Sequence, residues 1–548
     1  KHLKKCRMLL DGFFETLNEF TYIVKKKFRN IYQNSSFYEK KISKTFDNEF
    51  IYKPSPHLLS SIIKYQNKKY KIEDFELETV WNKQIKSKDL EKLNNFFWLF
   101  SLDLKSSKNS VKKVITNWIT NNNYFKKESW EIDMTAKRII SCLSNHQLTY
   151  DDNDKEYRLI FDQMIQKQTN HLLNEIKNSQ DLENKIICCS AIILTGLCYK
   201  IKKNYLDIGL SFLKKISNSS IDNQGFTNSR NIKQLIFFLK YFIIIREWFK
   251  ESQVEVPDHI EENIYYLGQS YAFIRQNINT DFLFNGNNNS NTQDFDHYLK
   301  RLGYKFKNEN KDCGGYIILK NKKICIAMDV GSSPNSRYTQ NYQSGALSFE
   351  IISNGKKLIT NCGYYNKNNQ NLNEISKSSA AHSTLIIDDN SSCKFTKKKG
   401  ALILKTGLKI TKKNSVYEKN YWKINAAHDG YFKKFKSIHE RNIEFFPEQM
   451  KFVGNDKIIK KKNNYNFKFD IRFHLEPNIK LMKTQDNKSI LIELDDEGWK
   501  FTCDNYEINI DNGLYFGNKN SYIENQNIFV SGILNDKEEN IKWELKKI

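Results

Sequence analysis

The first half of the chain carries apolar residues at helical spacing. Between residues 230 and 250 they fall at Ile232, Leu235, Ile236 and Leu239, which marks one face of an amphipathic helix. The same spacing predicts further helices over about 88–103, 110–121, 130–146, 156–177, 184–200, 204–216 and 258–276. Successive amphipathic helices with short connections favour antiparallel helix pairs.

The pattern changes after the polar stretch 285–294, which predicts a linker. Beyond it, apolar residues alternate with a period of two. Residues 347–360 predict two strands around an Asn354-Gly355 turn, because a type I′ turn needs positive φ at both central residues. Further strands are predicted there over 383–387, 401–412, 467–475, 489–494 and 527–533, and one strand in the N-terminal part over 75–80, leading into the first helix. The second half is therefore expected to be an antiparallel β domain.

The predicted fold class is a multidomain α + β protein, since 548 residues are too many for one ordinary core. We expect a mixed N-terminal extension over 1–84, a helical domain over 85–290 and an antiparallel β domain over 291–548. No run of 18 apolar residues occurs, so no membrane span is expected. The first residue is Lys1, so a signal peptide is neither seen nor excluded.

The chain is strongly basic. It has 87 Lys and Arg against 63 Asp and Glu, a formal net charge of +24. The excess of basic residues falls in 1–150 and 301–450. Either an AT-rich base composition or a polyanionic partner explains it. Nucleic acid is not the expected partner, because no recognition motif accompanies the charge.

Ten cysteines form no CxxC pair, which argues against a zinc ribbon or a redox motif. The densest group of polar residues near glycines and strand ends includes Asp329, Gln343, Asn361 and His382. His382 is either a satisfied structural histidine or a general acid or base.

This group, with short motifs in the same order over residues 85–548, resembles the heparinase II/III-like family. The other motifs are Asn117-Trp118, Trp130 with Arg138, and residues 191–197, 225–231, 284–286, 315–316, 428–431, 439–441, 473–475 and 499–501. The resemblance implies an incomplete α/α toroid followed by an antiparallel β-sandwich, with a cleft between them. It also implies β-elimination on a polysaccharide that contains uronic acid. Such a reaction needs a base, an acid and groups that neutralise the substrate carboxylate.

Carried over residue by residue, the resemblance assigns catalytic roles to His382, Arg230, Asn231 and Tyr342, and substrate binding to Gln343, Asn361, Asn285 and Tyr364. Arg230 and Asn231 would face the carboxylate, while His382 and a tyrosine transfer protons. His428, His439 and His474 match family positions but are interpreted as structural.

The chain also departs from the family pattern. The Asn-His pair at the head of the helix ending in residues 191–196 is missing, and Asn170-His171 lies one helix too early. Gln343 and Asn361 stand where some members have metal ligands, so neither a metal nor a cofactor is expected. The leading hypothesis is a polysaccharide lyase. The alternative is a catalytically impaired member that binds glycans or takes part in surface-polysaccharide assembly. The periplasm or cell envelope is the expected location, with the cytoplasm, the oligomeric state and the particular polysaccharide left open.

Overall fold

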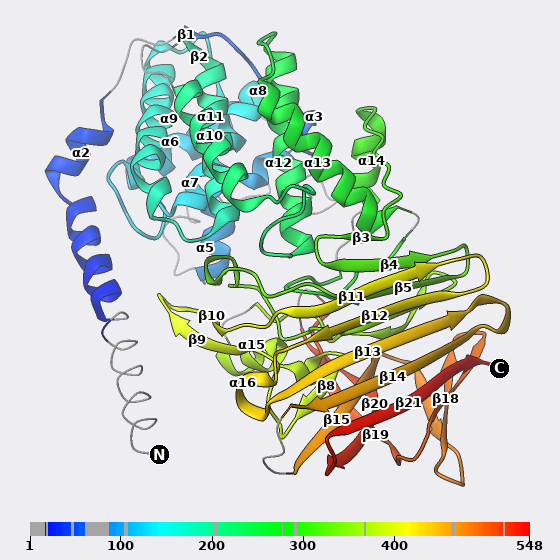
Figure 1. Ribbon diagram of the computed structural model, residues 1–548. Coiled ribbons are helices and arrows are strands. Elements are labelled where there is room, and N and C mark those ends of the chain that lie inside the picture. Colours follow the sequence, from blue (N-terminus) through cyan, green and yellow to red (C-terminus); the bar gives the residue numbers. More distant parts are fainter. Residues whose placement is uncertain are drawn as a thin grey trace. The chain divides into compact units, whose positions relative to one another are not determined.

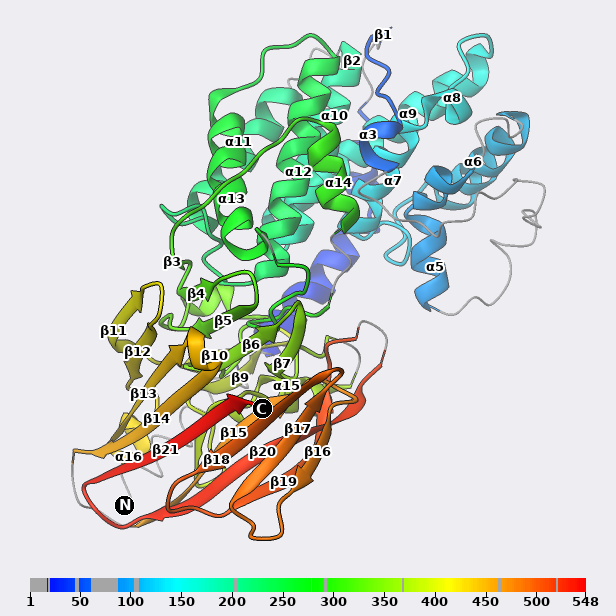
Figure 2. The same ribbon diagram turned by 90° about the vertical axis from the view of Figure 1, so that its right-hand side faces the viewer.

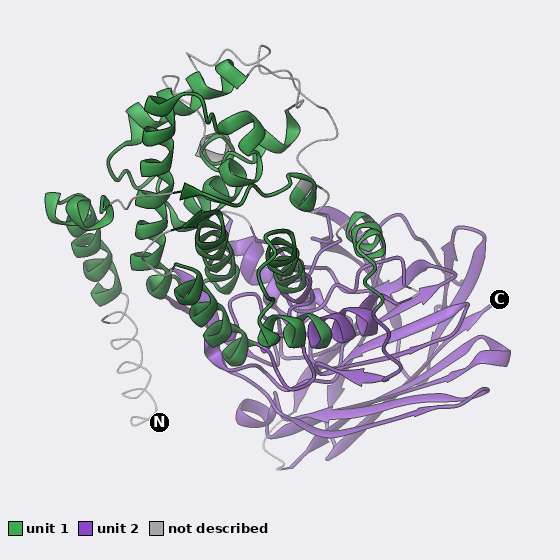
Figure 3. Cartoon of the chain, turned by 90° about the horizontal axis from the view of Figure 1, so that it is seen from above, with its two compact units in different colours: residues 1–220, 237–265, 292–305 green, residues 221–236, 266–291, 306–548 purple. Residues whose placement is uncertain are grey.

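A computed structural model describes residue 17 and residues 20–44, 49–60, 87–102, 108–200, 205–276, 278–289, 293–366, 369–461, 466–518 and 521–548. They fall into two compact units (Figure 3). The first comprises residues 1–220, 237–265 and 292–305, and the second comprises residues 221–236, 266–291 and 306–548. The predicted division at residues 84 and 290 stays a prediction.

The described chain before residue 302 is mainly helical (Figure 1). Its α-helices are α2 (Ser36–Ile42), α3 (His57–Ser60), α5 (Ser87–Asn94), α6 (Lys108–Asn122), α7 (Ile132–Ser144), α8 (His146–Thr149), α9 (Lys155–Glu175), α10 (Leu182–Cys198), α11 (Tyr205–Ser220), α12 (Ile232–Glu251), α13 (Asp258–Arg275) and α14 (Gln293–Arg301). The short elements are β1 (Glu49–Phe50), β2 (Tyr199–Lys200), η2 (Phe97–Ser101) and η3 (Ile176–Asn178).

Helix α10 shows why the sequence folds this way. Its residues from Ile186 to Thr195 are all buried, and it packs against α7, α9 and α11. The side chain of Asp181 caps its first turn by accepting from the backbone N–H groups of Glu183 and Asn184. The helices predicted from apolar spacing are confirmed within a few residues, apart from 88–103, which divides into α5 and η2.

The chain after residue 311 is mainly β. Its strands are β3 (Asp312–Cys313), β4 (Tyr316–Lys320), β5 (Ile324–Asp329), β6 (Phe349–Ser353), β7 (Lys356–Thr360), β8 (Leu385–Ile387), β9 (Lys394–Lys398), β10 (Ala401–Thr406), β11 (Ile410–Tyr417), β12 (Trp422–His428), β13 (Ser437–Phe446), β14 (Lys451–Lys460), β15 (Phe467–Leu475), β16 (Lys480–Lys483), β17 (Ser489–Leu494), β18 (Glu497–Cys503), β19 (Ile508–Tyr515), β20 (Ile523–Leu534) and β21 (Glu538–Lys547). Short helices are η4 (Ser336–Tyr338), α15 (Gln370–Lys377), η5 (Ser379–Ala381), α16 (Phe432–Phe435) and η6 (Pro447–Gln449).

Two large antiparallel sheets form a β-sandwich (Figure 2). One has the order β11-β12-β13-β14-β21-β18-β17-β16, and the other the order β19-β20-β15-β7-β6-β5-β4-β3, with β8 also paired to β15. Strand β13 alternates buried and half-buried positions along its length, as one core-facing side of a sheet requires. Phe349 of one sheet stacks on Trp543 of the other at 5.6 Å between ring centroids, in the shared core.

The predicted order, helices followed by antiparallel strands, is confirmed. Asn354 and Gly355 both have positive φ and join β6 to β7 in the predicted hairpin. The single strand predicted over 401–412 is wrong: β10 pairs only with β9, and β11 begins the eight-stranded sheet. The linker predicted over 285–294 is also wrong in part, because Asn285 and Asn287 are buried and α14 begins at Gln293. The strand predicted over 75–80 lies outside the described residues. Among those described, no helix has the length and apolar character needed to cross a membrane.

Candidate functional site

Arg230 is the centre of a buried polar cluster in the second unit. Its Nη2 donates to Oδ1 of Asp329 at 2.6 Å and to the carbonyl of Gly315 at 2.8 Å. Its Nε and Nη1 donate to the carbonyls of Gly314 and Gly331. Burial alone would lower the arginine pKa, but the adjacent Asp329 carboxylate outweighs burial and raises it. Arg230 is therefore a permanent cation whose partners all belong to the protein.

Glycines make room for this guanidinium. A Cβ on Gly331 would lie 2.2 Å from Cζ of Arg230, and one on Gly315 would lie 2.7 Å from its Nε. Arg230 itself has a φ of 59°, a left-handed conformation that costs energy in a residue with a side chain. The contacts of the guanidinium offset that strain.

Asn285 and Asn231 extend the cluster. Nδ2 of Asn285 donates to Oδ2 of Asp329 at 2.9 Å and to the hydroxyl of Tyr316 at 2.7 Å. Oδ1 of Asn231 accepts from the backbone N–H of Gln234 and so caps the start of α12. Both asparagines are buried, and the hydrogen bonds described above hold their side chains to protein groups.

Gln343 and Asn361 are fully buried. Oε1 of Gln343 accepts from the N–H of Gly286, while its Nε2 donates to the carbonyls of Gly363 and Ser376. Asn361 donates from Nδ2 to Oε1 of Glu350 and accepts through Oδ1 from the N–H of Ser383. These two amides hold loops together at the ends of β6 and β7.

Among the described residues, no group of three or more His, Cys, Asp or Glu is placed to hold a metal ion. The amides of Gln343 and Asn361, which stand at the family's ligand positions, use their oxygens to accept from backbone N–H groups. These residues do not fit a metal centre, because neutral amides stand in place of the histidine and carboxylate ligands that such a centre needs.

Tyr342 and His382 were assigned to proton transfer. The hydroxyl of Tyr342 lies 3.1 Å from Oγ of Ser333, and burial raises the pKa of this phenol well above its usual value. Nδ1 of His382 lies 2.7 Å from the carbonyl of Ser378, which can only accept, so Nδ1 carries the proton. Nε2 is then a bare acceptor, and among the residues that the structure describes it is buried without a hydrogen-bond partner. Burial lowers the pKa of His382 to about 4, so the ring is neutral near pH 7.

The surroundings of His382 leave space only for small groups. A Cβ on Gly345 would lie 2.6 Å from Cδ2 of the ring. The carbonyl that holds Nδ1 belongs to Ser378, the C-cap of α15. His382 is therefore fixed in tautomer and orientation, with its unprotonated Nε2 buried against Gly345.

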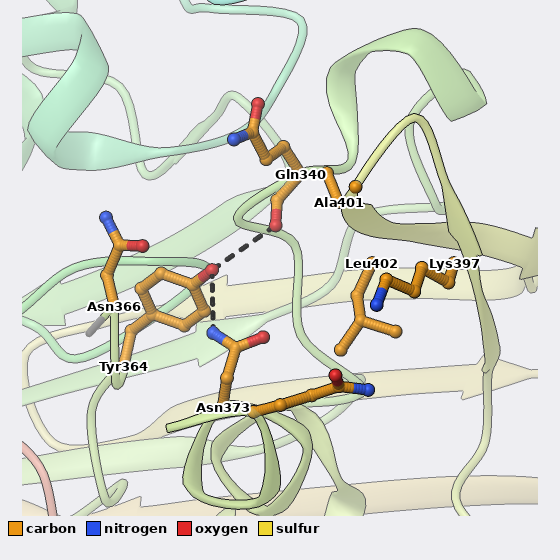
Figure 4. A pocket seen from close by; sticks show the side chains of 9 residues that line it. Gln340, Tyr364, Asn366, Asn373, Lys397, Ala401 and Leu402 are labelled. Carbon is orange, nitrogen blue, oxygen red and sulfur yellow. Dashed lines mark hydrogen bonds between the residues drawn. The ribbon is translucent and has the colours of Figure 1, made fainter. Parts of the chain in front are cut away.

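Tyr364 lines a pocket of about 260 Å³ in the second unit (Figure 4). The other lining residues are Gln340, Asn366, Gln370, Asn373, Lys397, Gly400, Ala401 and Leu402. The Tyr364 hydroxyl donates to the carbonyl of Gln340 and accepts from Nδ2 of Asn373 (Figure 4). Of the eight residues assigned from the sequence, Tyr364 alone is among the lining residues of this pocket.

The structure thus links some of the assigned residues directly. A chain of hydrogen bonds runs from Arg230 through Asp329 to Asn285 and on to the backbone N–H of Gln343. The sequence assignments missed Gln340, Asn373 and Lys397 of the pocket. The run of Asn and Gln over 366–373, interrupted by a lysine and a leucine, is the feature of the sequence that could have indicated part of this pocket. The catalytic roles themselves stay predictions.

The remaining family-matched histidines lie inside the sandwich. Nδ1 of His428 accepts from the N–H of Gly430, so its Nε2 donates to Nδ1 of His439 at 3.3 Å. Nε2 of His439 then donates to Oδ1 of Asp456 at 2.7 Å, and Arg441 binds the same carboxylate. All four side chains are buried. These four side chains form one buried hydrogen-bond chain, called here the structural relay, and its role is to hold the strands of the sandwich together.

His474 and the Asn170-His171 pair are also engaged. Nε2 of His474 donates to the carbonyl of Ala380, and its Nδ1 faces the thiol of Cys362. In the first unit, Nε2 of His171 donates to the carbonyl of Trp130 and its Nδ1 accepts from the hydroxyl of Tyr38. Each ring therefore has protein partners on both nitrogens.

Comparisons with known proteins agree with this architecture. Residues 310–544 match the family model described as heparinase II/III-like, C-terminal. A crystal structure of heparinase III shares 14% identity at a TM-score of 0.69, covering 93% of this chain and 88% of that one. The heparan sulfate lyase HepC of Pedobacter heparinus, solved as a mutant, shares 11% identity at a TM-score of 0.65, covering 85% and 78%. No curated protein sequence matches the chain. Residues 310–544 thus match the heparinase II/III-like C-terminal domain, and the chain has the fold of the heparinase III structures.

Proposed function

We propose that the chain cleaves an acidic polysaccharide, one that contains uronic acid, by β-elimination. The observation that carries the proposal is His382. It is a neutral imidazole with a fixed tautomer, and its Nε2 lone pair has no hydrogen-bond partner among the described residues of the heparinase II/III-like domain. β-Elimination needs a base with an unprotonated lone pair, which Nε2 supplies. Because Nε2 is buried, the step also requires the protein around it to open to the substrate.

The proposed step balances as follows. Nε2 of His382 accepts the proton from C5 of the uronic acid, and the electrons of that bond form a double bond between C4 and C5. The bond from C4 to the bridging oxygen breaks, and that oxygen takes its proton from the imidazolium of His382 as it leaves, which returns His382 to its neutral form. No water enters the products, so the two carboxylates of a glycoside hydrolase are not required.

The test measures ultraviolet absorbance of the new unsaturated uronic acid on a panel of uronic acid polysaccharides. The wild-type protein is compared with His382→Gln and with His297→Ala, a matched change at an exposed histidine in the first unit. We expect product from the wild type and His297→Ala, and a loss of at least about 100-fold in kcat for His382→Gln, the usual size of a lost general base. No product on any substrate from folded protein would refute the proposal.

Binding without turnover is a second candidate function, and Arg230 favours it. Its guanidinium is paired with Asp329 and three backbone carbonyls, so it is not placed to neutralise a substrate carboxylate. Calorimetry on the same panel distinguishes the two functions. Saturable binding with no unsaturated product, unchanged in His382→Gln, would support the binding role over β-elimination.

A further inference from the structure

Lys377 is a buried lysine with an unusual set of partners. It is the last residue of α15 and is 1% exposed. Its Nζ donates to the carbonyls of Gln340, Tyr342 and Leu402 at 2.5, 3.2 and 3.3 Å. Within the described part of the chain no carboxylate pairs with it, and burial lowers its pKa to about 7. A buried ammonium without a counter-charge is costly, and an incoming anion would offset that cost.

Two of these carbonyls belong to walls of the pocket that Tyr364 lines. Gln340 and Leu402 both line it, and Figure 4 shows Leu402 on the side across from Tyr364. The Lys377 Nζ also lies 5.6 Å from the ring centroid of Tyr364, a third lining residue. The positive charge of Lys377 therefore lies directly behind the pocket wall and ties its sides together.

The lining itself is chemically selective. Gln340, Asn366, Gln370 and Asn373 supply carboxamides, and Lys397 of β9 supplies an exposed ammonium. None of the nine lining residues is acidic and none is an arginine. Carboxamides both donate and accept, as sugar hydroxyls do, so they pair well with hydroxyls. Sulfate oxygens only accept, and they would face the amide oxygens unfavourably.

The size of the pocket limits its occupant. A volume of about 260 Å³ lies below the roughly 300–1,000 Å³ of sites that enclose drug-sized ligands. One sugar ring fits this space better than an oligosaccharide. A single exposed cation also matches a ligand unit that carries one negative charge.

We propose that this pocket binds one unsulfated uronic acid unit, with its carboxylate on Lys397 and in the field of Lys377, and its hydroxyls on the carboxamides. The inference rests on the proposed function, because the bound unit belongs to the polysaccharide that the protein acts on. It deepens that function by naming an unsulfated polyuronate as the substrate class.

The experiment measures binding of trigalacturonate and trimannuronate by calorimetry on the whole chain. Their carboxyl-reduced and O-sulfated forms serve as ligand controls. We expect the unsulfated uronates to bind most tightly and the carboxyl-reduced forms to bind at least about ten-fold more weakly, the size of one lost charge-assisted hydrogen bond. Equal binding of the carboxyl-reduced forms, tighter binding of the sulfated forms, or no uronate binding would overturn the proposal.

Protein variants sharpen the test. Lys397→Gln removes the exposed ammonium, and Lys398→Gln is its matched control, because Lys398 follows it on β9 and is not a lining residue. We expect Lys397→Gln and Asn373→Ala to weaken uronate binding about ten-fold and Lys398→Gln to leave it within two-fold. Equal effects of the two lysine changes would contradict the assignment.

The pocket and the chemistry can fail separately. Uronate binding that depends on Lys397, with no unsaturated product, would leave the pocket assignment standing and remove β-elimination. If wild-type protein forms product and Lys397→Gln leaves the KM unchanged, β-elimination stands and the pocket assignment is refuted.

Discussion

Arg230 donates from Nη2 to Oδ1 of Asp329 across 2.6 Å, and Asn285 donates to the other oxygen of the same carboxylate. Arg230 lies in the segment before α12, Asn285 lies in the segment before α14, and Asp329 is the last residue of β5. One buried carboxylate thus holds the two segments that carry Arg230 and Asn285. Oδ1 of Asn285 in turn accepts from the backbone N–H of Gln343.

Asp329→Asn is expected to destabilise the protein by about 3–5 kcal/mol, because it leaves a buried guanidinium without its counter-charge. Urea unfolding of the wild type and the variant measures the difference. The matched control is Asp511→Asn, which removes the half-exposed partner of Arg472 and should cost less than about 1 kcal/mol. Similar losses in the two variants would show that the Arg230 pair is not a structural centre.

Acid should destabilise the protein through its buried histidines. Burial lowers the pKa of His382 and of His171 to about 4 and that of His474 to about 3, whereas the unfolded chain titrates near 6.5. Between these values the unfolded state binds more protons, so the unfolding free energy falls as pH drops from about 6.5 towards 4. His382→Gln removes one of these titrations. Its stability relative to the wild type should therefore rise by on the order of 1–3 kcal/mol from pH 7 to pH 4.5. A constant gap across that range would contradict a neutral, buried His382.

Asp162 should have the opposite pH effect. It is buried in the first unit, accepts from the hydroxyl of Tyr199 at 2.7 Å, and burial raises its pKa to about 6. The folded state then binds more protons between pH 4 and 6, so this group costs stability as pH rises through that window. The unfolding free energy of Asp162→Asn minus that of the wild type should increase from pH 4 to 6. Above about pH 6.5 this difference should stay constant. Thermal unfolding at a series of pH values measures this, and a gap that does not change with pH would rule the shift out.

The relay in the sandwich predicts two histidine tautomers. Because the N–H of Gly430 donates to Nδ1 of His428, both His428 and His439 should carry their proton on Nε2. The nitrogen chemical shifts of the imidazoles report directly which ring nitrogen carries the proton. The exposed His297 serves as the control for a ring that exchanges between both tautomers. A proton on Nδ1 of His439 would break the proposed direction of the relay.

Local features of this fold could be read from the sequence, because local chemistry decides them. The turn at Asn354-Gly355 needs only two residues that tolerate positive φ, and β15 coincides with its predicted range of 467–475. Which strands pair with one another could not be predicted in this way. The contact of β8 with β15 joins segments about eighty residues apart, and alternation alone does not specify the partner.

The candidate site shows the same limit. The family resemblance selected Arg230 and Asn285, but Asp329, which holds both, is 99 residues from Arg230, and no spacing rule connects them. Asn285 and Asn287 lie in a run of polar residues that ordinarily predicts exposed linker. Their burial depends on particular acceptors, Asp329 and the carbonyl of Phe282, that only the folded chain brings within reach.

Strand β21 has a consequence for synthesis on the ribosome. It lies between β14 and β18 in the eight-stranded sheet (Figures 1 and 2), so β11–β14 and β16–β18 are joined only through residues 538–547. Until those residues emerge, a nascent chain carries two half-sheets with open edges, the kind of surface that pairs with other chains. The eight-stranded sheet therefore becomes continuous only once residues 538–547 have been made, and the edges of β14 and β18 stay open to wrong pairing until then.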